Sequence, residues 1–254
     1  MKLLVLSDAH ANIWALRQVM EQEQDYDYLA FAGDMVDYGI APGPVIEWFQ
    51  NAPRTWIVQG NHDLHALNIA RETAGKQVPD KEYKWIHYDL ERMTPSQLDY
   101  LRQLPKSVFF TLDGWAYVME HQYKFGTYET IENTAQFTAY WKEHAPQEYW
   151  DAPKKRIIFG PSHRQSTHIL AEGMEWFNPG SISYRRPDDP LKTAQYMVVE
   201  NGTIHMKNVP YDRSELYQEA MRQLHQGRMM DTEIQDFRFF FGGAQTSRDP
   251  LPEV

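Results

Sequence analysis

Short apolar runs alternate with amphipathic stretches along the first third of the chain. The apolar runs cover residues 2–7, 28–32 and 55–58, and their length is typical of buried strands. Between them, residues 13–23 carry apolar side chains at helical spacing, and residues 44–50 form a shorter helix candidate. Strands that alternate with helices predict βαβ units and a parallel sheet, so we expect an α/β fold.

The next stretch, from about residue 65 to 105, is rich in charge and has a helical pattern that stops at a proline. We expect this stretch to be a helical insertion. Residues 108–112 and 115–119 then predict a β-hairpin around the turn pair Asp113-Gly114.

The second half of the chain predicts a long helix, further strands and a pair of helices near the C-terminus. The long helix spans residues 127–144, and a polar tail from residue 242 to 254 is expected to be poorly ordered. The strands are expected at 156–159, 167–170, 175–177, 195–199 and 203–208, and the C-terminal helices within about 213–241. No repeat and no linker interrupts this pattern, so residues 1–254 are predicted to form a single domain.

The amino-acid composition limits which metal ligands and partners the protein can have. The chain has no cysteine, so any metal must be held by His, Asp, Glu or Asn. Its net charge of −10 disfavours a long nucleic acid as partner. No apolar run approaches the roughly 20 residues of a membrane span, so no membrane contact is expected. Together with the lack of a signal-peptide pattern, these features favour a cytoplasmic protein.

Side chains able to bind a metal follow several predicted strands. Asp8 and His10 come after the first strand, and their spacing of two predicts that both side chains lie on one side of an extended backbone. The others are Asp34, Asn61 and His62, His121, and His163, each at the end of a later strand. The carboxyl ends of parallel strands meet at one edge of a sheet, so we expect these side chains to converge there. Carboxylates mixed with imidazoles suit Mn, Fe, Zn or Ni.

The order of these motifs resembles the calcineurin-like metallophosphoesterase family over about residues 2–212. The motifs are Asp8-Ala9-His10, Gly33-Asp34-Met35-Val36-Asp37, Gly60-Asn61-His62-Asp63, His121 and Gly160-Pro161-Ser162-His163. The segment Asn178-Pro179-Gly180-Ser181 is similar to the bacterial and archaeal phosphodiesterase branch. The helical insertion and the C-terminal helices resemble a subgroup that contains diadenosine tetraphosphate hydrolases.

The resemblance implies a four-layer α/β/β/α sandwich that binds two divalent metal ions (Mn, Fe, Ni or Zn). It assigns the first metal to Asp8, His10, Asp34 and His163, with Asp34 as the bridging ligand. It assigns the second metal to Asn61 and His121. The expected reaction is hydrolysis of a phosphomonoester or phosphodiester, on a small molecule or nucleotide, by a metal-activated hydroxide.

The resemblance also suggests catalytic and substrate-binding residues. His62 would protonate the leaving oxygen, and Asp63, the next residue, would orient His62. Asn12 and Arg164 are candidate substrate contacts, although Asn12 is equally a helix N-cap candidate and Arg164 a solvated surface charge. Arg185 and Arg186 are further candidates for a phosphate clamp, and Tyr38 and Tyr184 for stacking on a base.

One position breaks the family pattern. Pro161 stands where the motif has a histidine that ligates the second metal, so we expect the second metal to bind more weakly than the first. His168, nearby in sequence, falls within a strand and is a poor substitute.

Alternative functions stay open. They are a catalytically weakened phosphate or nucleotide sensor, a dinucleoside polyphosphate hydrolase and, disfavoured by the net charge, a nuclease. The cluster Phe237, Phe239, Phe240 and Phe241 is expected to pack a terminal helix on the body, with a homodimer contact as the alternative.

Overall fold

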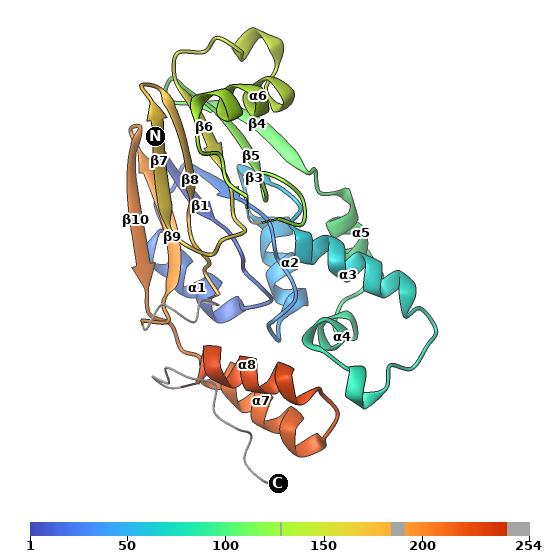
Figure 1. Cartoon of the computed structure of the whole chain (residues 1–254). Helices are drawn as coiled ribbons and strands as arrows, with labels where there is room; N and C mark the ends of the chain where they lie inside the picture. The colour runs from blue at the N-terminus through green and yellow to red at the C-terminus, as the bar shows by residue number, and fades with distance from the viewer. Residues whose placement is uncertain (128, 184–190, 243–254) are drawn as a thin grey trace.

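Two five-stranded sheets form the centre of the computed structural model, which describes residues 1–127, 129–183 and 191–242 (Figure 1). The first sheet has the order β10-β9-β1-β2-β3. Its strands are, along the chain, β1 (Lys2–Leu6), β2 (Tyr28–Phe31), β3 (Thr55–Ile57), β9 (Ala194–Glu200) and β10 (Thr203–Val209). The first three strands run parallel, as the alternation of strands and helices predicts, and β9 joins β1 antiparallel. The chain's first strand therefore lies in the middle of the sheet.

The second sheet has the order β4-β5-β6-β8-β7. Its strands are β4 (Ser107–Leu112), β5 (Trp115–Glu120), β6 (Lys155–Ile158), β7 (Ser166–Ala171) and β8 (Met174–Asn178). The predicted hairpin is confirmed as the antiparallel pair β4–β5, while β6 lies parallel to both β5 and β8. Each sheet is thus mixed, and its parallel strands point toward a common edge.

Alternation of side chains along the strands builds the layers. Leu3 and Val5 of β1 point between the sheets and pack with Met119 of β5 and Ile158 of β6. Leu4 on the opposite face of β1 packs instead with two helices, α1 (Ile13–Gln22) and α2 (Pro42–Asn51), and α6 (Thr134–His144) covers the second sheet. The expected four-layer α/β/β/α sandwich is confirmed.

The helical insertion and the C-terminal helices pack against each other. The insertion holds α3 (Asn61–Glu72), a short 3-10 turn (Asp80–Glu82), α4 (Trp85–Leu90) and α5 (Pro95–Gln103), and the chain ends in α7 (Ser214–Gln226) and α8 (Asp231–Phe241). The Trp85 Nε1–H donates to the Glu233 carbonyl at 3.1 Å, and its ring lies 4.0 Å from that of Phe237. The phenylalanines of α8 are buried in this packing, as expected for an intramolecular contact.

Two helix starts differ from the sequence prediction. Helix α6 begins at Thr134 and not at residue 127, because the Asn133 side chain caps it by accepting from the N–H of Gln136 at 3.0 Å. Helix α3 begins at Asn61 and not at residue 65. The polar tail beyond residue 242 lies outside the described residues. No helix in the described part of the chain combines the length and apolar character needed to cross a membrane.

Candidate functional site

The predicted metal ligands converge where the parallel strands end. Asp8 and His10 follow β1, Asp34 follows β2, His121 follows β5 and His163 follows β6. Their ligand atoms form two groups, each with all atoms within 4.8 Å of one another: Asp8 with His10 and His163, and Asp8 with Asp34 and His121. Asp8 belongs to both groups, so the two candidate ion sites are neighbours.

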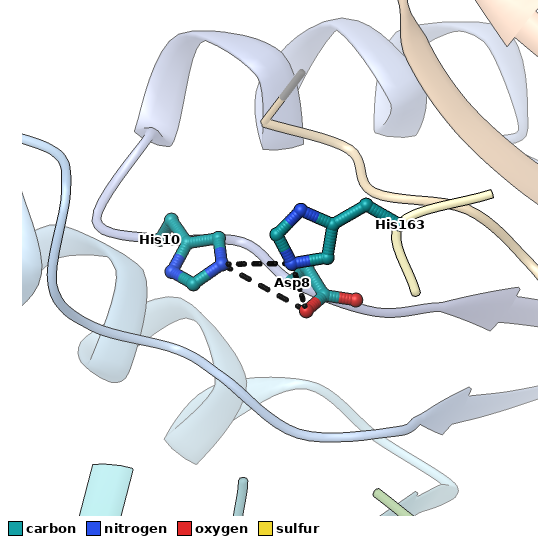
Figure 2. Close-up of side chains that lie close together, drawn as sticks. All are labelled: Asp8, His10 and His163. Carbon is teal, nitrogen blue, oxygen red and sulfur yellow. Dashed lines mark hydrogen bonds and ion pairs between the residues drawn. The ribbon is translucent and has the colours of Figure 1, made fainter. Parts of the chain in front are cut away.

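The first group is held tightly around one carboxylate (Figure 2). His163 Nε2 lies 3.0 Å and His10 Nε2 lies 3.7 Å from Asp8 Oδ1, and the two Nε2 atoms are 3.5 Å apart. The other nitrogen of His10, Nδ1, lies 3.2 Å from the Val36 carbonyl. A carbonyl only accepts, so Nδ1 carries the proton and Nε2 presents its lone pair to the group, as in a metal-ligating histidine.

His121 has the same arrangement in the second group. Its Nδ1 donates to the Ala32 carbonyl at 2.6 Å, and its Nε2 lies 3.2 Å from Asp34 Oδ2. Burial alone would raise the pKa of Asp34, but the imidazoles, His121 foremost, hold it well below its usual range. Burial alone would lower the pKa of His121, but the Asp34 carboxylate raises it to about 10. Both shifts of pKa mean that the space between His121 Nε2 and Asp34 Oδ2 favours a positively charged occupant, which is a proton or a metal ion.

The donor atoms fit a divalent cation. Asp8 Oδ1, Asp8 Oδ2 and His121 Nε2 are buried and have no hydrogen-bond partner. An unsatisfied buried polar atom costs about 1–3 kcal/mol, and a cation among these atoms would offset that cost. Imidazole nitrogens with carboxylate oxygens suit Mn, Fe, Zn or Ni better than Ca or Mg.

Strained backbone marks the same residues. The φ angles of Asp8, His10, Asp34 and His163 are +57°, +44°, +65° and +52°. A non-glycine residue in this region costs on the order of 1–3 kcal/mol, so the surrounding structure must enforce it, as functional sites often do. The expectation of an extended backbone from Asp8 to His10 is wrong. Their side chains converge because the chain turns through left-handed residues.

Two glycines allow the close approach of the strand ends. A Cβ atom on Gly60 would lie 2.0 Å from Asp34 Oδ1, and one on Gly160 would lie 2.2 Å from Ser7 Oγ. Neither position has room for a side chain, so glycine at both positions is what lets Asp34 and His121 meet.

Asp63 does not orient His62, which corrects the expected role. Asp63 Oδ1 accepts from the N–H groups of Met35 and Val36, at 2.8 and 3.3 Å. Its Oδ2 accepts from those of Gly60 and Asp34, at 2.9 and 3.1 Å. Asp63 therefore clamps the backbone that carries Asp34. Burial and the charge of Asp34 raise its pKa to about 6.

Asp37 is the partner of His62. Its Oδ2 lies 2.8 Å from His62 Nδ1, and His62 N–H in turn donates to Asp34 Oδ1 at 2.8 Å. Asp37 stands in the same motif as Asp34, and its position there is the only sequence signal for this pairing. The Tyr38 ring packs 4.8 Å from that of His62.

The insertion supplies a further buried carboxyl group that sequence reasoning missed. Asp89 of α4 accepts from the Asp37 N–H at 2.8 Å through Oδ2, while its Oδ1 is buried without a hydrogen-bond partner. Burial and the charge of Asp37 raise the pKa of Asp89 well above its usual range.

The two expected substrate contacts, Asn12 and Arg164, differ in exposure. Asn12 is fully buried and its amide is used within the fold, because Oδ1 caps α1 at the N–H of Ala15 and Nδ2 donates to Ser183 and Tyr211. It is an N-cap and not a substrate contact. Arg164 is exposed beside His163. Tyr184, Arg185 and Arg186 lie outside the described residues.

The remaining motif positions behave as predicted. The Ser181 hydroxyl donates to the Asp8 carbonyl at 3.1 Å, so the loop after Asn178 supports the site. Pro161 brings no ligand atom. The His168 ring stacks on Trp176 at 3.9 Å and belongs to neither ligand group found among the described residues.

Comparison with known proteins agrees with this geometry. Residues 1–202 match the model of the calcineurin-like phosphoesterase superfamily domain. The chain belongs to this superfamily. The calcineurin-like phosphoesterase superfamily is metal-dependent, and the two ligand groups are the candidate sites for its metal. No curated protein matches the chain.

Two solved structures share the calcineurin-like fold over nearly the whole chain. A metallophosphoesterase from Sphaerobacter thermophilus is 20% identical, with a TM-score of 0.68 over 94% of this chain and 100% of that one. A hypothetical protein from Pyrococcus horikoshii is 16% identical, with a TM-score of 0.69 over 96% of this chain and 99% of that one. At these identities both matches show the fold alone.

Proposed function

We propose that this protein is a hydrolase of phosphomonoesters or phosphodiesters, on a small molecule or nucleotide, that uses two divalent metal ions. One observation carries the proposal: two groups of ligand atoms, buried except for the half-buried His163, share Asp8 and lie beside His62, an imidazole that is paired with a carboxylate. A site that only bound phosphate would need no acid at that position. A paired histidine beside metal ligands is what cleavage of an ester bond requires.

The residues that hold the metals have distinct roles. Asp8, His10, Asp34 and His163 would hold the first ion, and Asn61 and His121 the second. Asp8, which belongs to both ligand groups, lies within reach of both ions. Bound there, the ions would supply positive charge to the phosphoryl oxygens and lower the pKa of a water molecule. The carbonyls of Val36 and Ala32 fix the tautomers of His10 and His121, so both imidazoles present Nε2 without rearrangement.

His62 is the proton donor. Asp37 accepts from Nδ1 at 2.8 Å, which fixes the tautomer and the orientation of the imidazole. As the oxygen of water forms its bond to phosphorus, the water gives up a proton to the solvent and the bond to the leaving oxygen breaks. That oxygen takes its proton from His62, which regains one from the solvent. Such a proton transfer contributes typically about 10²–10⁴-fold to the rate.

Hydrolysis of p-nitrophenyl phosphate and bis(p-nitrophenyl) phosphate tests the proposal. The protein is stripped with chelator and reloaded in turn with Mn, Fe, Co, Ni and Zn, and dinucleoside polyphosphates and cyclic nucleotides extend the panel. We expect turnover that is lost with chelator and restored by metal. His62→Asn should lower it most for the cyclic nucleotides, whose leaving oxygen needs a proton, while the matched His168→Asn variant keeps it. Metal binding without turnover of any substrate would favour the sensor. Preference for dinucleoside polyphosphates would assign the finer subgroup.

A further inference from the structure

A recess opens beside the second ligand group. It is a shallow cavity of about 40 Å³ that is open to solvent, and Asn61 and His121 are among its lining residues. It is also lined by Lys106, just before β4, and by Phe125, on the segment after β5. The recess thus joins candidate metal ligands to one cation and one aromatic ring, and we call it the Lys106–Phe125 recess.

Phe125 is unusual because its ring is 73% exposed. The other exposed large apolar side chains among the described residues are Met1, Ile169 and Leu191, none of which lines this recess. An exposed ring contributes little to folding, because it leaves its apolar area in water. Its position at the mouth of the recess therefore points to a ligand that covers it.

The segment that presents Phe125 is held by local hydrogen bonds. Gln122 Oε1 accepts from the Gly126 N–H at 3.2 Å, and the Thr127 N–H donates to the Lys124 carbonyl at 3.2 Å. Both bonds close a turn around Phe125. The backbone that carries the ring is thus ordered before a ligand arrives, which reduces the entropy lost on binding.

Lys106 supplies the positive charge of the recess, and Glu120 is its one carboxylate among the lining residues described. Glu120 is engaged by α6, since Tyr140 O–H donates to it at 2.6 Å and His144 Nδ1 lies 3.4 Å away. An anionic group in the recess would therefore meet Lys106 as its main charged neighbour.

The lining residues also indicate which part of a substrate would enter. The recess is lined by Asn61 and His121, but His62 is not among the described residues that line it. The group that leaves must lie near His62, because it takes its proton from there. The recess therefore suits a second substituent on phosphorus, which a phosphomonoester lacks.

We infer that the Lys106–Phe125 recess binds the retained half of a phosphodiester, and that this half is a nucleotide whose base stacks on Phe125 and whose further phosphate pairs with Lys106. This inference rests on the proposed function and narrows its substrate class. Aromatic side chains stack on any base face, so the recess would select nucleotides without selecting among bases. A lysine adds a point charge for a phosphate group.

Four p-nitrophenyl esters with the same leaving group test the inference. They are p-nitrophenyl phosphate and the p-nitrophenyl diesters of methyl phosphate, of thymidine 5′-phosphate and of thymidine 3′,5′-bisphosphate at its 5′ position. We expect kcat/KM to rise in that order. Phe125→Ala should lower kcat/KM about tenfold for both thymidine diesters, as stacking predicts, and leave the methyl diester unchanged. Lys106→Ala should remove the gain of about threefold that the 3′-phosphate gives.

The control is Ile169→Ala, which truncates an equally exposed side chain, 71%, on β7. It should change none of the four values. Equal kcat/KM for the methyl and thymidine diesters, or an unaltered preference in Phe125→Ala, would overturn the inference while the proposed function stood. Lack of metal-dependent turnover of all four esters by the unmodified protein would instead overturn the proposed function itself.

Discussion

Asp89 of the helical insertion accepts a 2.8 Å hydrogen bond from the backbone N–H of Asp37, whose carboxylate lies 2.8 Å from His62 Nδ1. The φ angle of Asp37 is +71°, so its backbone needs such support. A residue 52 positions away in sequence thereby fixes the partner of the proposed proton donor. The insertion is part of the site's scaffold and not only a surface elaboration.

Replacement of Asp89 should change how stability depends on pH. The folded-state pKa of Asp89 lies well above its unfolded value, so folding takes up a proton between the two. The free energy of unfolding therefore falls as pH rises through this window, by up to about 1.4 kcal/mol per pH unit. Asp89→Asn keeps the acceptor for the Asp37 N–H and removes the proton uptake. Urea unfolding from pH 5 to 8 should show a shallower decline, whereas Asp99→Asn, at a 58% exposed site, should match the parent. Parallel curves for Asp89→Asn and the parent would contradict the assignment.

Asp37→Asn and Asp63→Asn should have different effects, the first on catalysis and the second on stability. Asp37→Asn should lower kcat by about 10²-fold for alkyl phosphate esters and much less for p-nitrophenyl esters, whose leaving group needs little protonation. Asp63→Asn leaves one oxygen for four backbone N–H groups and should cost at least about 2 kcal/mol of stability. Kinetics on both ester types, with thermal unfolding, measure the two effects. A leaving-group dependence in Asp63→Asn but not in Asp37→Asn would reverse the roles.

Pro161→His should strengthen the second metal site. The imidazole would add a ligand near Asn61 and His121, and we expect the affinity for the second ion to rise more than about tenfold, the scale on which ligand-shell changes act. Metal content after dialysis, combined with competition titration, measures it. Pro161→Ala is the matched control, since it removes the ring without adding a ligand. Two tightly held ions in the unmodified protein would refute the expectation of a weak second site.

Phe237→Ala should destabilise the fold by about 3–5 kcal/mol. The ring is fully buried and packs 4.0 Å from Trp85 at the start of α4. Phe125→Ala, which removes the same atoms from an exposed site, should stay within about 0.5 kcal/mol of the parent. Urea denaturation of both variants decides this, and similar losses would mean that Phe125 is part of the packed structure.

The sequence predicted the convergence of these side chains because each follows a strand, and the ends of parallel strands meet at one edge of a sheet. It assigned Asp63 wrongly because the start of α3 was placed at residue 65. With the helix beginning at Asn61, Asp63 occupies the third helical position, where an acidic side chain turns back to the N–H groups at the helix start. The neighbour in sequence is therefore not the neighbour of His62 in space.

No local sequence pattern indicates that Asp89 accepts a hydrogen bond from the Asp37 N–H. It depends on α4 lying over the segment after β2, which tertiary packing decides. The left-handed backbone at Asp8 and His10 was hidden for the same reason. Neither residue type by itself predicts a left-handed conformation directly after a strand. The conformation is imposed by the hydrogen bonds that the Asp8 and His10 N–H groups donate to the carbonyls of Gly33 and Asp34.

The central position of β1 sets the order in which the site is made. The Asp8 carbonyl accepts from Ser181 Oγ and from the Ser183 N–H, and β1 also pairs with β9, which ends at Glu200. Asp8 is therefore synthesised long before the residues that hold it in place, because these extend to β9. At about 5–20 residues per second, that delay is roughly ten to forty seconds. Assembly of the candidate metal site is thereby tied to synthesis of residues far along the chain, and a nascent chain truncated before β9 lacks part of the structure that holds Asp8.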